Sequence, residues 1–175
     1  TYALSGNLSS DGNVGIGYYA GAGLTSGGNS VFIGYQAGLA KTTSGDDVYV
    51  GYFSGKSITV GRQNVAVGYA TLDAAVEDSA NVAIGYNALT AQNAGGSDGG
   101  ASETYNTAIG YTAGAGITTG TLNTIVGGDA GDAATTASGS VFLGMDAGGT
   151  VTTGNMNIAI GYDSMNGGTV TGDNN

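Results

Sequence analysis

A single glycine recurs through this chain at a nearly constant interval, and that interval constrains the fold more than any other feature. The glycine lies in a phrase close to N-V-A-I-G-Y-x-A-G, which is written nine times. Each gap is 17 residues, except that 25 residues separate Gly85 from Gly110. The nine glycines are Gly17, Gly34, Gly51, Gly68, Gly85, Gly110, Gly127, Gly144 and Gly161. A short period without a helical pattern predicts an all-β, parallel β-solenoid in which each repeat forms one coil.

The repeat covers the whole chain, so we expect a single repeat region over residues 1–175. Nine full coils are flanked by partial coils at both ends, and an eight-residue insertion falls within 91–105. Solenoids usually end in atypical capping repeats, and no such repeat is visible at either end of this sequence. We therefore expect the chain to be a fragment of a longer fibre.

Composition argues against several classes of protein. The formal charge is −10, from 13 acidic residues against three basic ones, and histidine and cysteine are absent. Nucleic-acid binding needs a basic surface, and a membrane helix needs about 20 apolar residues in a row. We expect neither nucleic acid nor membrane insertion. Without histidine and cysteine the usual catalytic bases and nucleophiles are missing, so we expect no enzyme and no cofactor.

The phrase itself can be interpreted residue by residue, counting from zero at the asparagine that opens it, such as Asn81 or Asn106. Positions 1 and 3 are Val, Ile, Leu or Thr in every repeat. Because side chains alternate across a strand, we expect these two positions to face the core of the coil. A second short strand is expected at positions 11–13. The invariant glycine at position 4 is expected to have a positive φ or to let another backbone come close.

Position 2 lies between two core positions, so its side chain is expected to point outward. It carries no charged residue in any repeat. A strand that is apolar on both faces is normally buried on both faces, which predicts an oligomer interface at this position. The predicted interface residues are Phe32, Tyr49, Ala66, Ala83, Ala108, Ile125, Phe142 and Ala159.

The segments Asn81–Leu89 and Asn106–Gly114 resemble two related repeat classes. One is the head repeat of trimeric autotransporter adhesins, and the other is the repeat of bacteriophage tail fibres and related bacterial surface fibres. The resemblance implies a parallel homotrimer of β-rolls with the N-V-A-I-G strands facing the three-fold axis. It also implies an extracellular structural segment, on a virion or a cell surface, that helps attachment to a glycan or protein receptor. Further copies or domains of the same fibre are the other implied partners.

A monomeric ice-binding or glycan-binding β-solenoid is the alternative interpretation. Position 12 is threonine in seven repeats, and flat threonine arrays are typical of ice-binding solenoids. Position 5 is tyrosine in seven repeats, and an exposed row of rings could bind sugars. Stacking of the tyrosines on one another is the simpler expectation, because rings at the spacing of coils bury area and fix the register.

Position 6 varies in the first six repeats and is then aspartate three times in succession, at Asp129, Asp146 and Asp163. In a parallel stack these carboxylates would lie about 5 Å apart, where like charges repel. Either the side chains spread into water or a cation such as Ca²⁺ lies among them. The sequence thus gives a candidate metal site at these three residues.

Overall fold

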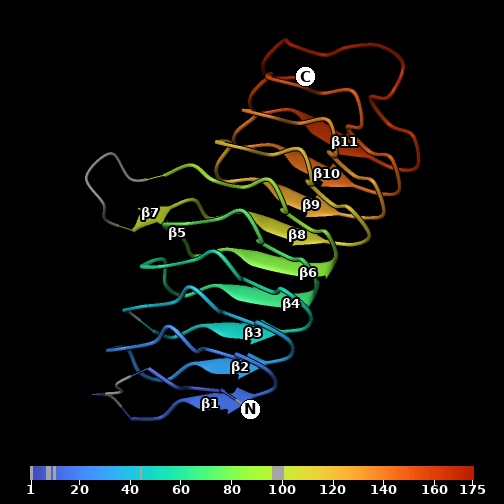
Figure 1. Cartoon of the computed structure of the whole chain (residues 1–175). Helices are drawn as coiled ribbons and strands as arrows, with labels where there is room; N and C mark the ends of the chain where they lie inside the picture. Colours follow the sequence, from blue (N-terminus) through green and yellow to red (C-terminus); the bar gives the residue numbers. More distant parts are fainter. Residues whose placement is uncertain (1, 7–8, 10, 44, 96–100) are drawn as a thin grey trace.

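The computed structural model describes residues 2–6, 9, 11–43, 45–95 and 101–175. Every regular element in these ranges is a β-strand, and none of them contains a helix. The chain winds as stacked coils into a rod, with the two ends of the chain at opposite ends of the stack (Figure 1). The predicted parallel β-solenoid with a 17-residue coil is therefore confirmed.

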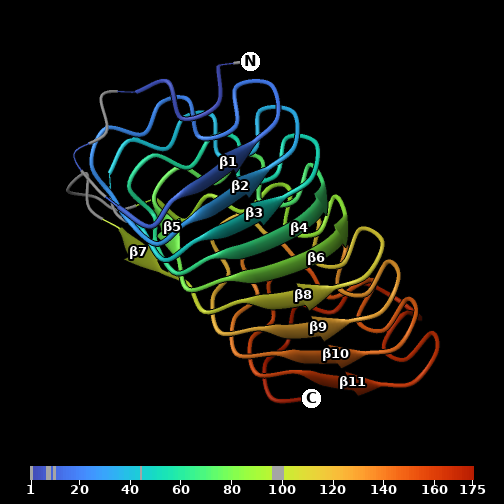
Figure 2. The same ribbon diagram turned by 90° about the horizontal axis from the view of Figure 1, so that it is seen from below.

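One strand from each repeat joins a nine-stranded parallel sheet that runs along one side of the rod (Figure 2). Strand β4 pairs with β6 so that Gly68 lies beside Gly85, and every other pair keeps the same register of equivalent positions. The strands of this sheet are β1 (Val14–Ile16), β2 (Val31–Ile33), β3 (Val48–Val50), β4 (Val65–Tyr69), β6 (Val82–Tyr86), β8 (Thr107–Ile109), β9 (Thr124–Val126), β10 (Val141–Leu143) and β11 (Ile158–Ile160).

The opposite side of the coil is less regular than expected. In the described residues it contains one strand pair, β5 (Asp78–Ser79) with β7 (Ser102–Glu103), and two isolated bridges, Ser26–Thr43 and Val151–Val170. The prediction of a second strand in each coil is thus wrong for most repeats. The carbonyl of Thr42 accepts hydrogen bonds from both Thr25 N (2.9 Å) and Ser26 N (3.2 Å), which breaks the alternation of a strand ladder.

The insertion leaves the sheet undisturbed. Ala83 pairs with Ala108 in the usual register although 25 residues separate them in sequence. The insertion departs from the coil after Ala94, whose N–H donates to Asp78 Oδ1 (2.8 Å), and the coil resumes at Ser102. Part of the predicted insertion, residues 96–100, lies outside the described residues.

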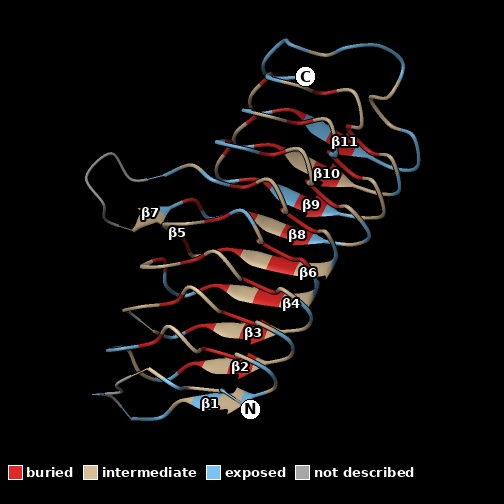
Figure 3. Ribbon diagram, in the orientation of Figure 1, coloured by how far each residue is buried: buried red, intermediate tan, exposed pale blue. Residues whose placement is uncertain are grey.

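The core lies inside the coil and is built on position 2, which corrects the prediction about the two faces of the strand. All eight predicted interface residues are fully buried within this single chain. They are Phe32, Tyr49, Ala66, Ala83, Ala108, Ile125, Phe142 and Ala159. In the nine-stranded sheet, Figure 3 shows the middle of every strand from β2 to β11 buried and its flanks partly or fully exposed, whereas the middle of β1 is only partly buried. These side chains cannot form an oligomer interface, because the rest of their own coil covers them.

The physical reason is the narrow interior of the coil. Across from position 2, the coil contributes small residues such as Ala113 and one apolar residue at position 11, such as Ile117 or Val151. This space accepts one side chain from each strand, and that side chain is the central one. Positions 1 and 3, such as Thr107 and Ile109, therefore point away from the core.

A ladder of polar side chains runs up one corner of the rod at position 0. From Asn13 to Ser140, each side chain accepts a hydrogen bond from the backbone N–H of the equivalent residue in the next coil. Asn106 Oδ1 accepts from Asn123 N, and Asn123 Oδ1 accepts from Ser140 N, both at 2.9 Å. All three residues are buried, so the ladder satisfies backbone groups that water cannot reach.

The invariant glycine meets both conditions expected of it. Its φ lies between +113° and +146° in all nine repeats. A Cβ atom on Gly110 would overlap the carbonyl oxygen of Gly127 in the next coil, and the other glycines of the row meet the next coil in the same way up to Gly144. The backbones of neighbouring coils therefore approach at a distance that only glycine permits.

Candidate interaction surface

The outer face of the nine-stranded sheet is apolar along its whole length. It is lined by the side chains of positions 1 and 3, which are valine, isoleucine, leucine or threonine in every coil. Several are well exposed, including Ile16 at 58%, Ile109 at 38% and Ile160 at 65%. In β4 and β6 the alternation continues to the tyrosine at position 5, so this residue borders the same face.

The tyrosines form a continuous stack beside the aliphatic residues. From Tyr18 to Tyr111 six rings follow one another, with centroids 4.9–5.4 Å apart and planes within 15° of parallel. The predicted ring stacking is confirmed. The ring faces are covered by their neighbours, and the edges with their hydroxyl groups remain open to solvent, at 40% exposure for Tyr35.

Near the amino-terminal end, residues at position 6 widen this aromatic column. The ring of Tyr19 lies 4.5 Å from that of Tyr18, and the ring of Phe53 lies 4.1 Å from that of Tyr52. The Lys56 amine stands 4.2 Å from the centre of the Phe53 ring, as a cation–π contact. We use the name outer apolar face for positions 1, 3 and 5 of the nine repeats, with the side chains of Tyr19 and Phe53 at its border.

The outer apolar face contains no charged residue. A contiguous apolar surface of this length is unusual on a soluble monomer and typically marks a site of association. Each strand has two apolar faces as predicted, but their roles are the reverse of the prediction. The surface that a partner could cover is the one with Ile16, Ile109 and Ile160, which the sequence had placed in the core.

The three aspartates of the candidate metal site occupy equivalent corners of successive coils, each with a positive φ. Thr112 Oγ1 donates to Asp129 Oδ1, and Asn166 Nδ2 donates to Asp163 Oδ1 at 2.6 Å. Within the described ranges, no three acidic, histidine or cysteine side chains are grouped closely enough to hold a metal ion. Ca²⁺ binding at Asp129, Asp146 and Asp163 therefore stays a prediction.

Burial and the negative charge of this acidic row change the pKa of the nearby Asp132. Burial raises the pKa of Asp132, and the negative charges of Asp129 and Asp146 raise it further. A Ca²⁺ titration of the melting temperature, with the Asp146→Asn variant as the comparison, tests the metal prediction directly. Stabilisation of the parent alone would support the site.

Threonine hydroxyl groups at position 12 donate hydrogen bonds to backbone carbonyl groups of the next coil. The Thr25 hydroxyl donates to the Thr42 carbonyl at 2.9 Å, and the Thr118 hydroxyl donates to the Thr135 carbonyl at 3.1 Å. Thr42, Thr59 and Thr135 make the same bond to the next coil. The hydroxyl protons are thus used within the rod, which leaves these oxygens as acceptors only.

One polar cluster inside the rod was not anticipated. Lys41 stands at position 11, where most other coils have an aliphatic residue, and its amine meets the carboxylate of Asp47. Both side chains are fully buried. The sequence did contain the signal, because Lys41 and Asp47 are the only charged residues at their two positions in any repeat.

Comparison with known protein families, with curated proteins and with solved structures gave no match. The described part of the chain also contains no helix that could cross a bilayer.

Proposed function

We propose that this chain is a structural shaft or head segment of an extracellular fibre that mediates attachment, as in a phage tail fibre or a bacterial adhesin. Three parallel copies associate through the outer apolar face, which then lies toward the common axis. The acidic residues elsewhere on the rod keep the assembled fibre soluble.

The observation that carries this proposal is the uncharged character of the outer apolar face over all nine strands. Burial of apolar surface stabilises an assembly by about 25 cal/mol for each Å². A repeated face is also self-matching, because copies aligned in parallel bring equivalent coils to the same level. The resemblance of the repeat to trimeric fibres supports three as the number of copies.

Two observations favour the fibre over the ice-binding or glycan-binding alternative. The position 12 hydroxyls, such as those of Thr25 and Thr118, donate their protons to carbonyl groups of the next coil. The tyrosine faces from Tyr18 to Tyr111 are stacked on one another, so a sugar ring would find only their edges. Neither row is arranged as a free recognition surface.

The test is to place a charge on the outer apolar face and measure association. Ile109 is 38% exposed, so an aspartate there can be solvated in a single chain but would be buried in an assembly. Thr119, which is exposed on the other side of the coil, provides the matched control. We expect Ile109→Asp to reduce the mass in solution to that of one chain and to keep the β-sheet circular dichroism spectrum, whereas Thr119→Asp leaves the parent's mass unchanged.

Buried like charges cost several kcal/mol, so the effect on association should be large. An Ile109→Asp protein that assembles like the parent would contradict the proposed interface. A parent that sediments as a single chain would contradict the fibre itself.

A further inference from the structure

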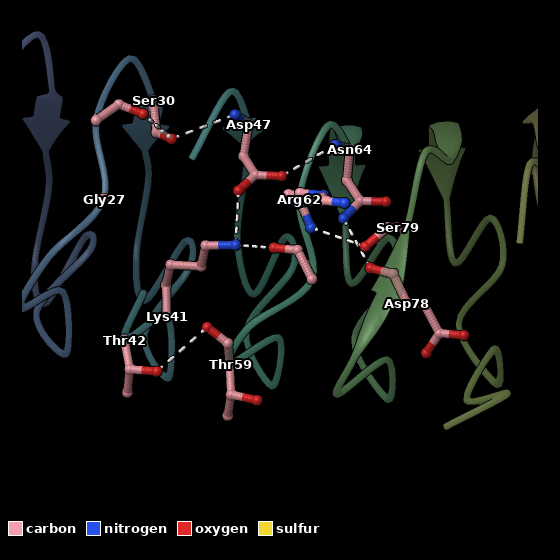
Figure 4. A network of polar contacts seen from close by, with 12 residues as sticks. Gly27, Ser30, Lys41, Thr42, Asp47, Thr59, Arg62, Asn64, Asp78 and Ser79 are labelled. Carbon is pink, nitrogen blue, oxygen red and sulfur yellow. Dashed lines mark hydrogen bonds and ion pairs between the residues drawn. The ribbon is translucent and has the colours of Figure 1, made fainter. Parts of the chain in front are cut away.

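Lys41 and Asp47 lie in adjacent coils and meet inside the rod, sealed from water (Figure 4). The Lys41 Nζ atom is 2.7 Å from Asp47 Oδ2, and neither side chain has any exposed surface. In other coils the same two places hold neutral pairs, such as Ile117 with Asn123. The fold therefore does not need a charged pair here, and the presence of one calls for a separate explanation.

Both groups are held in fixed positions by further contacts. Lys41 Nζ also donates a hydrogen bond to the carbonyl of Gly61. Asp47 Oδ1 accepts a hydrogen bond from the backbone N–H of Asn64 at 2.9 Å. Asp47 Oδ2 has Lys41 as its ion partner and no hydrogen bond beyond it. The amine is thus fixed against one oxygen of a carboxyl group whose other oxygen is polarised by an N–H donor.

The environment weakens the preference of the pair for its charged form. Burial lowers the pKa of the Lys41 amine and raises the pKa of the Asp47 carboxyl group, and the attraction between the two only partly opposes this. Transfer of one proton from Nζ to Oδ2 removes both charges from a medium that solvates them poorly. The result is a neutral amine, which is a nucleophile, in contact with a neutral carboxylic acid.

We propose that Lys41 and Asp47 react with each other to form an intramolecular amide bond, which covalently closes the turn between one repeat and the next. The lone pair of Nζ attacks Cγ of Asp47, so that the Nζ–Cγ bond forms and the Cγ–Oδ2 bond breaks. Oδ2 already carries the proton taken from the lysine, receives a second one from the attacking nitrogen and leaves as water. No oxidant, reductant or other reactant is needed.

The contacts seen around the pair match those that this reaction needs. The Asn64 N–H bound to Oδ1 stabilises negative charge on this oxygen in the tetrahedral intermediate. Burial and the Asp47 charge raise the pKa of the Tyr49 phenol, which therefore stays protonated. Well-oriented intramolecular reactions reach effective concentrations of about 10⁵–10⁸ M, and contact between the two groups favours such a reaction.

The product would keep the hydrogen bonds of the reactants. Oδ1 becomes the amide oxygen and still accepts from Asn64, and the remaining N–H on Nζ still faces the Gly61 carbonyl. Two buried charges are replaced by one satisfied amide group. Coils that hold Ile117 and Asn123 at these places cannot form such a bond, because they lack the amine.

Mass spectrometry of the full chain tests this proposal. After incubation to constant mass and complete denaturation, the parent should be lighter than its sequence mass by one water molecule. Trypsin should not cleave after Lys41, so the peptide 42–56 should be absent and a peptide spanning 1–56 should appear without that water. Fragmentation should place the missing water between Lys41 and Asp47.

Two variants exclude other origins of the loss. Lys41→Arg keeps the charge but has no reactive amine, and the double variant Lys41→Ile with Asp47→Asn copies the pair Ile117 and Asn123. Both should have their full sequence mass. Cyclisation at Asp11–Gly12 or Asp98–Gly99 would also release water, and it would persist in both variants. A parent at full mass, release of peptide 42–56, or a loss that survives in the double variant would overturn the proposal.

Discussion

The ring of Phe32 fills the space that a side chain on Gly38 would need, because a Cβ atom on this glycine would lie 2.5 Å from Cδ1 of the ring. The reverse arrangement occurs two coils later. There position 2 is Ala66, and the place equivalent to Gly38 is Leu72, which is fully buried. In these two coils the narrow core thus takes its large side chain from opposite walls.

This exchange predicts strong coupling between the two positions. Phe32→Ala alone should cost about 3–5 kcal/mol of unfolding free energy, and Gly38→Leu alone about 1–3 kcal/mol through overpacking. The double variant recreates the pair Ala66 and Leu72, and Leu72 has a φ of +51°, so leucine is compatible with this backbone. We expect the double variant to be more stable than Phe32→Ala alone. Denaturant unfolding at one fixed protein concentration measures the cycle, and strictly additive costs would contradict the shared space.

Gly110 should be among the least replaceable residues of the rod. Its φ is +146°, and a Cβ atom would overlap the Gly127 carbonyl oxygen, so Gly110→Ala is expected to cost at least about 1–3 kcal/mol. Gly128, which follows the invariant glycine Gly127, has open space where a Cβ atom would lie. Gly128→Ala is therefore the control, with an expected change in unfolding free energy within about 0.5 kcal/mol. Equal melting temperatures for the two variants would refute the close approach of the coils.

The position 0 ladder predicts that stability depends on the presence of a side-chain acceptor at this position more than on which residue provides it. Asn106→Ala leaves the buried N–H of Asn123 without a partner, which costs about 1–3 kcal/mol. Serine retains an acceptor, as Ser140 does when its hydroxyl oxygen accepts from Asn157 N at 3.1 Å. We therefore expect Asn106→Ser to lie between the parent and Asn106→Ala in thermal unfolding. An alanine variant as stable as the serine variant would show that the ladder contributes little.

Asp78 should make stability depend on pH. Burial raises the pKa of its carboxyl group, although hydrogen bonds from Ala94 and Gln92 to Oδ1 oppose the change. A raised folded-state pKa stabilises the fold below the ordinary value of about 4, and this stability is lost as the pH rises through the raised pKa. Relative to the parent, Asp78→Asn should thus become more stable as the pH increases toward neutrality. Unfolding free energies at several pH values check this, and a gap independent of pH would contradict it.

The sequence predicted the features that depend on the period. A strict repeat of Gly68 and Gly85 implies a stack with equivalent residues in register, and the structure has this register. The alternation of side chains in the sequence could not show which face of the strand lies inside the coil. Both faces are apolar, and a period of two separates the faces without saying which one is buried. A large residue at position 2 goes with a small one at position 8, as in Phe32 with Gly38, and the reverse holds for Ala66 with Leu72. This exchange of size is the signal in the sequence that position 2 lies inside the coil.

The buried pair of Lys41 and Asp47 could be suspected from the sequence but not constructed from it. Each residue is a charged exception in a neutral column. Their contact depends on how the chain bends between position 11 of one repeat and position 0 of the next, and turn geometry is not set by apolar periodicity. The second strand was overpredicted for a similar reason, because threonine at position 12, as in Thr25, favours strands in general but here bonds to the next coil's carbonyl.

Ala108 and Ile109 are adjacent in β8, and aspartate at the first should prevent folding, whereas aspartate at the second should prevent association. Ala108 is fully buried in the coil, so Ala108→Asp places an unpaired carboxylate in the core and should abolish the β-sheet spectrum of the single chain. Ile109→Asp should abolish association only. Circular dichroism combined with sedimentation distinguishes the two outcomes. If Ala108→Asp produced folded single chains instead, position 2 would be the interface after all.

In the proposed fibre, two further copies of the chain cover the outer apolar face. Sedimentation equilibrium of the parent over a range of concentrations tests it most directly, because it reports molar mass independently of shape. With a chain mass of 16.9 kDa, the account predicts a species of three times that value that persists on dilution. A single species at 16.9 kDa at all concentrations would contradict it.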